Sequence, residues 1–174
     1  MSLTLVLGGA RSGKSGYAQQ AAEAWAHACG VAPTFVATAT AGDAEMSDRI
    51  ASHQADRGDR WRTLEAPLAL ADTLALLGPR DVAVIDCLTL WLANSMAQQE
   101  GHVARVETLL PSLSACRARL WLVSNEVGWG IVPDNVLARD FRDEAGRLHQ
   151  KIATAASEVV LVVAGLPMTL KSKA

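Results

Sequence analysis

Eight residues near the amino terminus have the types and spacing of a phosphate-binding loop. They are Gly8-Gly9-Ala10-Arg11-Ser12-Gly13-Lys14-Ser15. In the pattern GxxxxGK[ST], Gly8 and Gly13 let the backbone turn tightly and bring N–H groups close to phosphate oxygens. Lys14 would bridge the β- and γ-phosphates, and the Ser15 hydroxyl would ligate Mg²⁺. Because the loop follows an apolar run and opens a helical segment, we predict a nucleoside triphosphate site here.

Two carboxylates end apolar runs further along the chain. In a site of this kind, a carboxylate on a neighbouring strand usually holds Mg²⁺. Asp86 follows the run Val82 to Ile85 and is the best candidate, although an aspartate there could also be a solvated strand end or a helix cap. Glu126 follows the run Leu120 to Val123 and is expected at the same edge of the sheet, where open α/β folds bind their ligands.

A second group of charged side chains lies between Asp43 and Arg62. If residues 44–57 are helical, five of them share one face at spacings of three and four. These are Met46, Arg49, Ile50, His53 and Arg57. The arginines would hold phosphate oxygens, and a neutral imidazole between them could attack phosphorus. By composition alone, a solvated charged helix remains the better interpretation.

The elements that must position these residues alternate along the chain. Short apolar runs predict buried strands at Leu3–Leu7, Thr34–Thr38, Asp81–Asp86, Leu120–Ser124 and Glu158–Val163. Helices are expected at Ser15–Cys29, Ala44–Arg57, Leu68–Leu77, Leu88–Glu100, Val103–Arg119 and Leu137–Ala156. Apolar strands separated by helices predict an α/β fold with a mostly parallel central sheet flanked by helices. No linker or repeat interrupts the pattern, so residues 1–174 are expected to form one domain.

Composition narrows the classes of function. The chain has 174 residues, half of them hydrophobic, and a formal net charge of -2. A protein that grips nucleic acid is usually basic, so we expect no nucleic-acid partner. No apolar run reaches the roughly 20 residues of a membrane span, and the opening apolar run is too short for a signal peptide. Three separated cysteines suggest neither disulfides nor a metal site, so we expect reduced thiols and a cytoplasmic protein.

The motifs that the sequence lacks reduce the number of possible reaction classes. The chain has no NKxD or TKxD stretch, which disfavours a Ras-like GTPase, and it lacks the HRD and DFG elements of protein kinases. A small-molecule kinase or a nucleotidyl transferase remains. The alternatives are a P-loop kinase of a small metabolite without a covalent intermediate, and a non-catalytic nucleotide-binding regulator.

Several further stretches resemble one enzyme family. Besides the loop, they are Ala37-Thr38-Ala39, Asp43-x-Glu45-Met46-x-x-Arg49-Ile50-x-x-His53, Trp61-Arg62-Thr63-x-Glu65-x-Pro67, Asp86-Cys87-Leu88-Thr89-Leu90-Trp91-Leu92-x-Asn94, Asn125-Glu126-Val127-Gly128-x-Gly130-Ile131-Val132-Pro133 and Arg139-x-Phe141-Arg142-Asp143-x-x-Gly146. Together they resemble the bifunctional adenosylcobinamide kinase/adenosylcobinamide-phosphate guanylyltransferase family of cobalamin biosynthesis. His149 departs from the family, which usually has asparagine at this position.

The resemblance implies a RecA-like P-loop fold and two reactions. A nucleoside triphosphate, ATP or GTP, phosphorylates the aminopropanol hydroxyl of adenosylcobinamide. GTP then transfers GMP to adenosylcobinamide phosphate through a guanylylated histidine, giving adenosylcobinamide-GDP and pyrophosphate. His53 occupies the position of that histidine, and Lys14 would stabilise charge on the pyrophosphate. The resemblance also implies Mg²⁺ at Ser15 and Asp86, and a homo-oligomer.

The family's nucleotide contacts fall on residues of the loop and of four other stretches. Beyond Gly8 to Ser15, these are Ala37, Thr38, Ala39, Gln54, Ala55, Asp56, Arg57, Glu65 and Asp86.

Other conspicuous side chains are expected to be structural. His27 and His102 should lie at the surface or at helix ends, and Cys87 should be inert. The tryptophans in apolar stretches should pack in the core; these are Trp25, Trp91 and Trp121. Trp61 and Trp129 are expected to pack in the core or a loop, although either could touch a corrinoid. Lys171 and Lys173 are interpreted as a frayed terminus.

Overall fold

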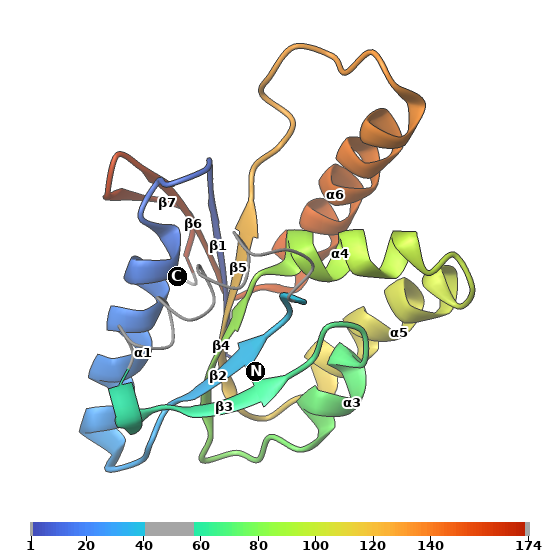
Figure 1. Cartoon of the computed structure of the whole chain (residues 1–174). Coiled ribbons are helices and arrows are strands. Elements are labelled where there is room, and N and C mark those ends of the chain that lie inside the picture. Colours follow the sequence, from blue (N-terminus) through green and yellow to red (C-terminus); the bar gives the residue numbers. More distant parts are fainter. Residues whose placement is uncertain (1, 41–57, 173–174) are drawn as a thin grey trace.

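The centre of the molecule is a seven-stranded sheet with the strand order β3-β2-β4-β5-β1-β6-β7 (Figure 1). The computed structural model describes residues 2–40 and 58–172. The strands are β1 (Ser2–Gly8), β2 (Thr34–Ala37), β3 (Arg62–Glu65), β4 (Val82–Asp86), β5 (Arg119–Asn125), β6 (Glu158–Val163) and β7 (Leu166–Lys171). Strands β1 to β6 run parallel, and β7 folds back antiparallel on β6. The prediction of a mostly parallel α/β sheet is confirmed.

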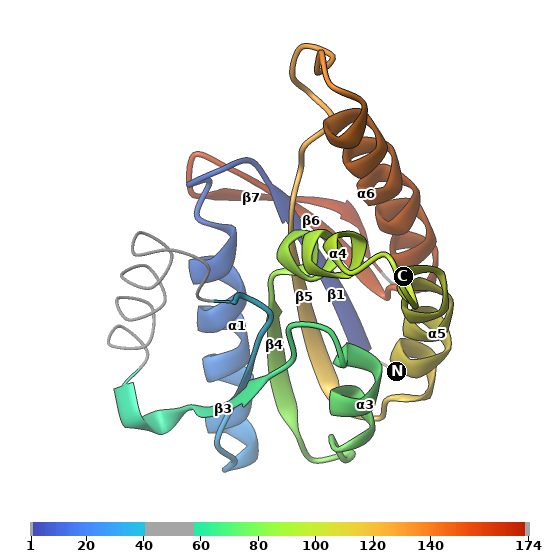
Figure 2. The ribbon, with the colours of Figure 1, turned by 45° about the vertical axis from the view of Figure 1, so that its right-hand side comes forward.

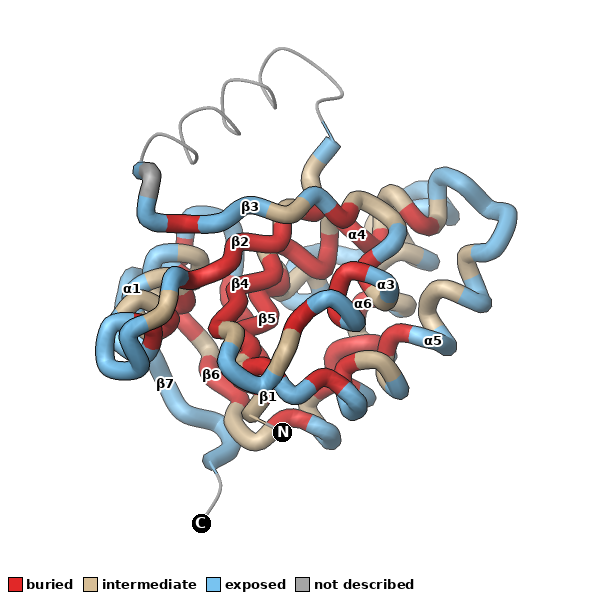
Figure 3. Tube along the Cα trace, turned by 90° about the horizontal axis from the view of Figure 1, so that it is seen from below, coloured by how far each residue is buried: buried red, intermediate tan, exposed pale blue. Residues whose placement is uncertain are grey.

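Helices cover both faces of this sheet. Helix α1 (Lys14–Cys29) lies on one face; the helices of the other are α3 (Leu70–Ala75), α4 (Leu88–Ala97), α5 (His102–Ala115) and α6 (Val136–Ala155) (Figure 2). A short 3₁₀ turn, η1 (Gly58–Arg60), precedes β3. Because successive side chains of a strand point to opposite faces, Leu3 and Leu5 join one core while Val6 joins the other. Figure 3 shows the buried residues concentrated along the inner strands.

Helix α1 reaches the sheet through small side chains. Ala18, Ala22 and Ala26 repeat every four residues, are buried, and pack against Val6 and the neighbouring apolar residues of its face. The helix ends at Cys29, as predicted, and the left-handed φ of 66° at Gly30 lets its N–H reach the carbonyl oxygen of His27. The spacing places the alanines on one face, and their small size lets the helix, with the loop at its start, approach the strands closely.

Most of the expected elements are confirmed within the described residues, with small shifts of their ends. The helix expected over residues 44–57 lies outside the described residues. The helix expected over Val103 to Arg119 stops at Ala115, because Arg119 already belongs to β5, where it pairs with Ser2 and Val82. The helix expected over Leu68 to Leu77 is shorter, at Leu70–Ala75.

Two strands were not expected. Strand β3 is an exposed edge strand of four residues, so it carries no apolar run that would predict burial. Strand β7 is fully exposed and contains Pro167, and the interpretation of Lys171 as part of a frayed terminus is wrong. Lys171 lies in β7, and its Nζ donates to the carbonyl oxygens of Ala153 and Thr154 at 2.8 and 3.0 Å. Lys173 lies outside the described residues.

The tryptophans divide between core and surface. Trp91 and Trp121 are buried, as expected, but Trp25 is 44% exposed on α1, so its assignment to the core is wrong. The guanidinium of Arg119 lies 3.9 Å from the centre of the Trp25 ring, a cation–π contact at the surface. Trp61 is buried as expected, with its ring edge-on to Phe35, and its Nε1 donates to Glu23 Oε1 at 2.9 Å.

His27 and His102 lie where the sequence predicts, at the surface and at a helix end. His27 is exposed near the end of α1, and His102 begins α5, where its Nδ1 forms a 2.9 Å hydrogen bond with the Ser95 hydroxyl.

Across residues 2–40 and 58–172, none of the helices has the length and apolar character that crossing a membrane requires.

His149 is a buried polar residue between α6 and the sheet. Its Nε2 forms a 2.7 Å hydrogen bond with the hydroxyl of Ser124, which is itself fully buried in β5. Burial lowers the pKa of His149 below 6.5, although the negative charge of Glu126 acts in the opposite direction. The folded protein therefore holds this imidazole neutral under conditions in which an unfolded chain would protonate it.

This difference predicts an acid-dependent loss of stability. The unfolded chain binds a proton near pH 6.5 and the folded chain only at lower pH, so the free energy of unfolding should fall as the pH drops below about 6.5. For one proton the slope is at most about 1.4 kcal/mol per pH unit. Denaturant unfolding between pH 7.5 and 5 should show a smaller slope for His149→Asn than for the wild type. The exposed His27 gives a control, and an equal change of slope in His27→Asn would contradict the assignment.

Candidate active site at the carboxyl edge of the sheet

The parallel register brings the ends of five strands to one edge. Gly8 pairs with Asn125, and Asp86 lies between Ala37 and Val123. Ala37 in turn pairs with Glu65 at the end of β3. The phosphate-binding loop, the candidate metal carboxylate and two predicted nucleotide contacts therefore share the carboxyl edge of the sheet, the usual ligand site of this architecture (Figure 1).

The phosphate-binding loop ends in an uncapped helix terminus. Gly13, the N-cap of α1, has a left-handed φ of 94° and, as a glycine, makes no side-chain cap hydrogen bond to the first turn. The first turn also contains no acidic residue. The N–H groups of a first helical turn have no partners within the helix, and the helix dipole makes this end positive. This terminus can therefore hold an anion.

Two other segments hold the loop in shape. Ser12 accepts a 2.8 Å hydrogen bond at its carbonyl from the N–H of Gly165, which lies in the turn between β6 and β7. Glu126 donates its N–H to the carbonyl of Gly8 at 2.9 Å. Both bonds occupy loop carbonyl oxygens, which would otherwise repel a phosphate. The unexpected β6–β7 hairpin is thus a direct support of the site.

Lys14 lies inside the loop. Its side chain is only 8% exposed, and its Nζ donates to the carbonyl of Gly9 at 3.0 Å. Burial and the charge of Asp86 raise the pKa of the Cys87 thiol, while the positive charge of Lys14 lowers it. The ammonium group therefore acts electrostatically at the end of β4, in addition to its contact within the loop. Cys87 is buried and protonated, in agreement with the expectation that it is inert.

A hydrogen-bonded network fixes the backbone after β2. Thr38 is fully buried, and its Oγ1 donates to the carbonyl of Cys87 at 2.7 Å. Asn94 of α4 donates its side-chain amide to the carbonyls of Thr38 and Pro67, at 2.8 and 3.2 Å. The predicted contacts Ala37 and Thr38 are thereby held against the end of β4 and against α4. Asn94 was part of a matched stretch, but its residue type alone did not predict this bridging role.

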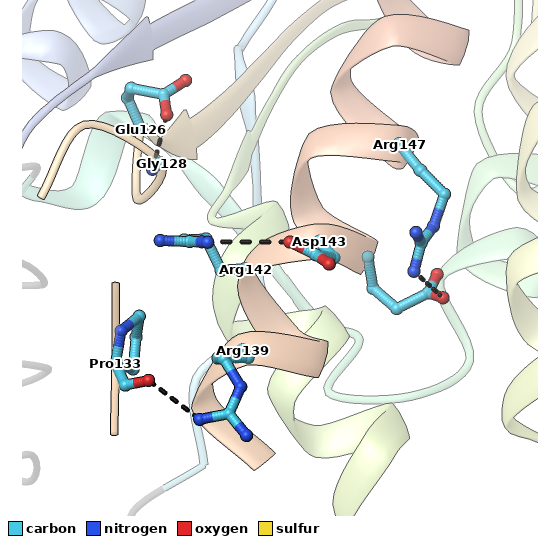
Figure 4. A network of polar contacts seen from close by, with 8 residues as sticks. Glu126, Gly128, Pro133, Arg139, Arg142, Asp143 and Arg147 are labelled. Carbon is cyan, nitrogen blue, oxygen red and sulfur yellow. Dashed lines mark hydrogen bonds and ion pairs between the residues drawn. The ribbon is translucent and has the colours of Figure 1, made fainter. Parts of the chain in front are cut away.

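The loop that follows β5 is held by a polar contact of its own and by an arginine of the first turns of α6 (Figure 4). Glu126 Oε1 accepts from the N–H of Gly128 at 2.7 Å. Arg139 Nη1 donates to the carbonyls of Pro133 and Asp134, at 3.0 and 2.8 Å. Trp129 is 75% exposed, so the expectation that it packs in the core or the loop is wrong.

The predicted site residues divide into two groups. The loop residues, Ala37 to Ala39, Glu65 and Asp86 gather at one edge of the sheet, where their roles in binding remain predictions. His53 and residues 54–57 lie outside the described residues. Ser15 and Asp86 are the described side chains predicted to hold a metal, and no cluster of three or more histidine, cysteine, aspartate or glutamate side chains suited to a metal occurs within residues 2–40 and 58–172.

Comparisons with known proteins agree on one family. The family model described as cobinamide kinase / cobinamide phosphate guanyltransferase matches residues 4–170. A Pseudomonas aeruginosa protein named bifunctional adenosylcobalamin biosynthesis protein CobP is 48% identical over 172 residues, 97% of each chain. Proteins named CobU, with the same description, are 36% identical in Escherichia coli and 39% in Salmonella typhimurium, over 97% of this chain and 99% of each relative.

The loop geometry predicts opposite outcomes for two neighbouring glycines. A Cβ at Gly8 would clash with Ser12 Oγ and would lie 2.6 Å from the carbonyl oxygen of Val162, whereas a Cβ at Gly9 would meet no atom within 4 Å. Because Val162 is in a strand and cannot move freely, Gly8→Ala should lower the free energy of unfolding by about 1–3 kcal/mol. Gly9→Ala is the matched control and should unfold like the wild type. Denaturant titration checks both, and equal midpoints for the two variants would contradict the packing described here.

Proposed function

Because the chain belongs to the cobinamide kinase / cobinamide phosphate guanyltransferase family, we propose that it is a bifunctional transferase of adenosylcobalamin biosynthesis. In the first reaction, a nucleoside triphosphate phosphorylates the aminopropanol hydroxyl of adenosylcobinamide. In the second, GTP donates GMP to adenosylcobinamide phosphate, giving adenosylcobinamide-GDP and pyrophosphate. The observation that carries the proposal is the uncapped, positively polarised start of α1 in a family-typical phosphate loop.

Both reactions need the triphosphate tail held in one place. The first-turn N–H groups of α1 would bind the phosphate oxygens, and Lys14 would exchange its contact with Gly9 for one with the phosphates. In the kinase step, the acceptor hydroxyl oxygen forms a bond to the γ-phosphorus, the bond from the β–γ bridging oxygen to that phosphorus breaks, and the hydroxyl proton passes to solvent water. The charge that develops on the departing diphosphate would lie beside Lys14, whose ammonium group would stabilise it.

Ser15 and Asp86 fit the magnesium ion that such reactions use. Ser15 in the first turn of α1 and Asp86 at the end of β4 offer hydroxyl and carboxylate oxygens, the hard donors that Mg²⁺ prefers. The charge of Lys14 acts on Cys87, next to Asp86, which supports the two elements meeting at one site. When bound, Mg²⁺ would neutralise charge on the phosphate oxygens.

For guanylyl transfer we propose a covalent intermediate on His53. A neutral imidazole nitrogen would form a bond to the α-phosphorus of GTP as the bond from that phosphorus to the bridging oxygen breaks and pyrophosphate leaves. A phosphate oxygen of adenosylcobinamide phosphate would then attack the same phosphorus and release the imidazole. The matched stretch around His53 supports this role, and the two-step route divides one difficult substitution into two easier ones.

The surface is compatible with the homo-oligomer that we also propose. Strand β7 leaves the apolar side chains Leu166, Met168 and Leu170 exposed by more than half. They are every second residue of the strand and therefore share one face, and contiguous exposed apolar groups often mark contacts between subunits.

Replacement of His53 should separate the two activities. His53→Ala should abolish the acid-labile adduct that forms with GTP labelled at the α-phosphate, because no other nucleophile would replace the imidazole. Phosphorylation of adenosylcobinamide should largely persist, since the histidine takes no part in that step. The adduct is measured after denaturation, with GTP labelled at the γ-phosphate and His27→Ala as controls. An undiminished adduct in His53→Ala would exclude this residue as the nucleophile.

Replacement of Lys14 should impair both activities together. Lys14→Ala removes the charge that faces the phosphates, and kcat/KM should drop by about 100- to 1,000-fold in each reaction. Lys151→Ala, at an exposed lysine of α6, is the control for a general effect of charge. If the Lys14 variant transferred GMP at the wild-type rate, the two reactions would not share one triphosphate site.

A further inference from the structure

The chain between β5 and α6 carries an exposed apolar surface. Five large hydrophobic side chains lie close together in the sequence, and each is more than half exposed: Trp129, Ile131, Val132, Val136 and Leu137. Figure 1 and Figure 2 show this segment and the start of α6 standing out beyond the carboxyl edge of the sheet. We call residues 127–137 the apolar loop. Contiguous exposed apolar groups of this kind mark a binding surface.

Polar contacts hold the apolar loop in shape and leave these side chains free. Glu126 accepts from the N–H of Gly128 at one end, and Asn135 caps α6 at the other by accepting from the N–H of Ala138 at 2.8 Å. The arginine of α6 described above binds two carbonyl oxygens between them. Ile131 is 97% exposed, so its side chain contributes almost nothing to the fold. A ligand that covers this surface therefore meets little cost of ordering it.

The apolar loop begins beside the phosphate-binding loop. Glu126, directly before it, donates its N–H to the carbonyl of Gly8 at 2.9 Å. Trp129 follows three residues later, and three residues of chain span at most about 11 Å. A molecule that lies on the apolar loop can therefore present a reacting group to a triphosphate held at the start of α1.

The charge of the apolar loop decides between the two kinds of substrate in the proposed reactions. Residues 127–137 contain one charged side chain, that of Asp134, and it is negative. A nucleoside triphosphate is strongly anionic and gains nothing from such a surface. The acceptor, cobinamide, has a broad corrin ring with methyl groups along its edge, and its hydroxyl group lies at the end of a short arm. Aliphatic side chains and an indole offer this ring apolar and stacking contacts.

We propose that the apolar loop binds the corrin ring of the acceptor, with Trp129 against the ring and Ile131 and Val132 beside it. The inference rests on the proposed function, because cobinamide or its phosphate is the acceptor in both reactions. Binding here removes apolar side chains from water and leaves the arm of the acceptor free to reach the phosphate site. The ring keeps the same contacts while phosphate is transferred, so the loop contributes to the affinity for the acceptor and not to the chemical step.

Two substitutions on the loop test acceptor binding. Burial of one large apolar side chain corresponds to about a tenfold change in the dissociation constant, or more. Trp129→Ala should therefore raise the Kd for adenosylcobinamide about tenfold, and Ile131→Ser should raise it in the same direction. Trp129→Phe keeps an aromatic ring and should lose much less affinity. Equilibrium dialysis against the whole enzyme measures these constants through the visible absorbance of the corrinoid.

The kinetics of the kinase step provide a second measurement. The KM for adenosylcobinamide should rise in the Trp129→Ala and Ile131→Ser variants, whereas kcat at saturating acceptor and the Kd for GTP should keep their wild-type values. Both side chains are so exposed that their loss should leave the melting temperature unchanged. Trp25→Ala is the matched control, because it removes an exposed tryptophan of α1 and should not change acceptor binding.

The outcomes separate this inference from the proposed function. If the wild type phosphorylates adenosylcobinamide and the loop variants keep its Kd and KM, the inference is overturned and the proposed function stands. If light scattering shows that the loop variants form a smaller assembly than the wild type, the surface is a contact between copies of the chain, and the inference is again overturned. If the wild type neither binds nor phosphorylates adenosylcobinamide, the proposed function fails and the inference fails with it.

Discussion

The hydrogen bond between the Gly165 N–H and the Ser12 carbonyl ties the middle of the phosphate loop to the β6–β7 turn. An anion-binding loop must point its N–H groups inward, so its carbonyl oxygens need partners elsewhere. The β6–β7 turn supplies one such partner, and the chain after β5 supplies another at Gly8. The glycines follow from the same requirement, because Gly13 has a left-handed backbone and Gly8 leaves no room for a Cβ beside Val162. The glycines of the loop, the β6–β7 hairpin and the shape of the phosphate loop therefore depend on one another.

Much of this arrangement could be predicted from local signals. The apolar runs predicted five of the seven strands, because inner parallel strands are buried on both sides and consist of such runs. The two edge strands, β3 and β7, are exposed and lack that signal. The ends of helices were harder to place than their existence. Arg119 has a residue type common in helices, yet pairing with Ser2 and Val82 places it in a strand.

In the site too, features made by residues adjacent in the sequence could be predicted, whereas contacts between distant segments could not. The position of the loop between β1 and α1 could be predicted because its eight residues are contiguous, and the position of Asp86 at a strand end because it closes an apolar run. The network of Thr38, Cys87, Asn94 and Asn125 could not, since it joins four elements and depends on which strands are neighbours. Asn125 stood in a matched stretch, but only the strand order shows that it lies next to Gly8. A polar residue at the end of a central strand is the signal that would have marked it.

The proline of β7 limits how molecules of this protein can associate. Ala164 and Gly165 form a two-residue turn, both with positive φ, so the first pair of the hairpin, Val163 and Leu166, exchanges hydrogen bonds. The next pair, Val162 and Pro167, then does not, and the ring nitrogen of Pro167 faces away from β6. An added strand would find no donor there, which interrupts growth of the sheet from one molecule into another. Subunits that meet at this edge would have to do so through the side chains of β7, so the same strand can support a finite assembly and resist fibrous aggregation.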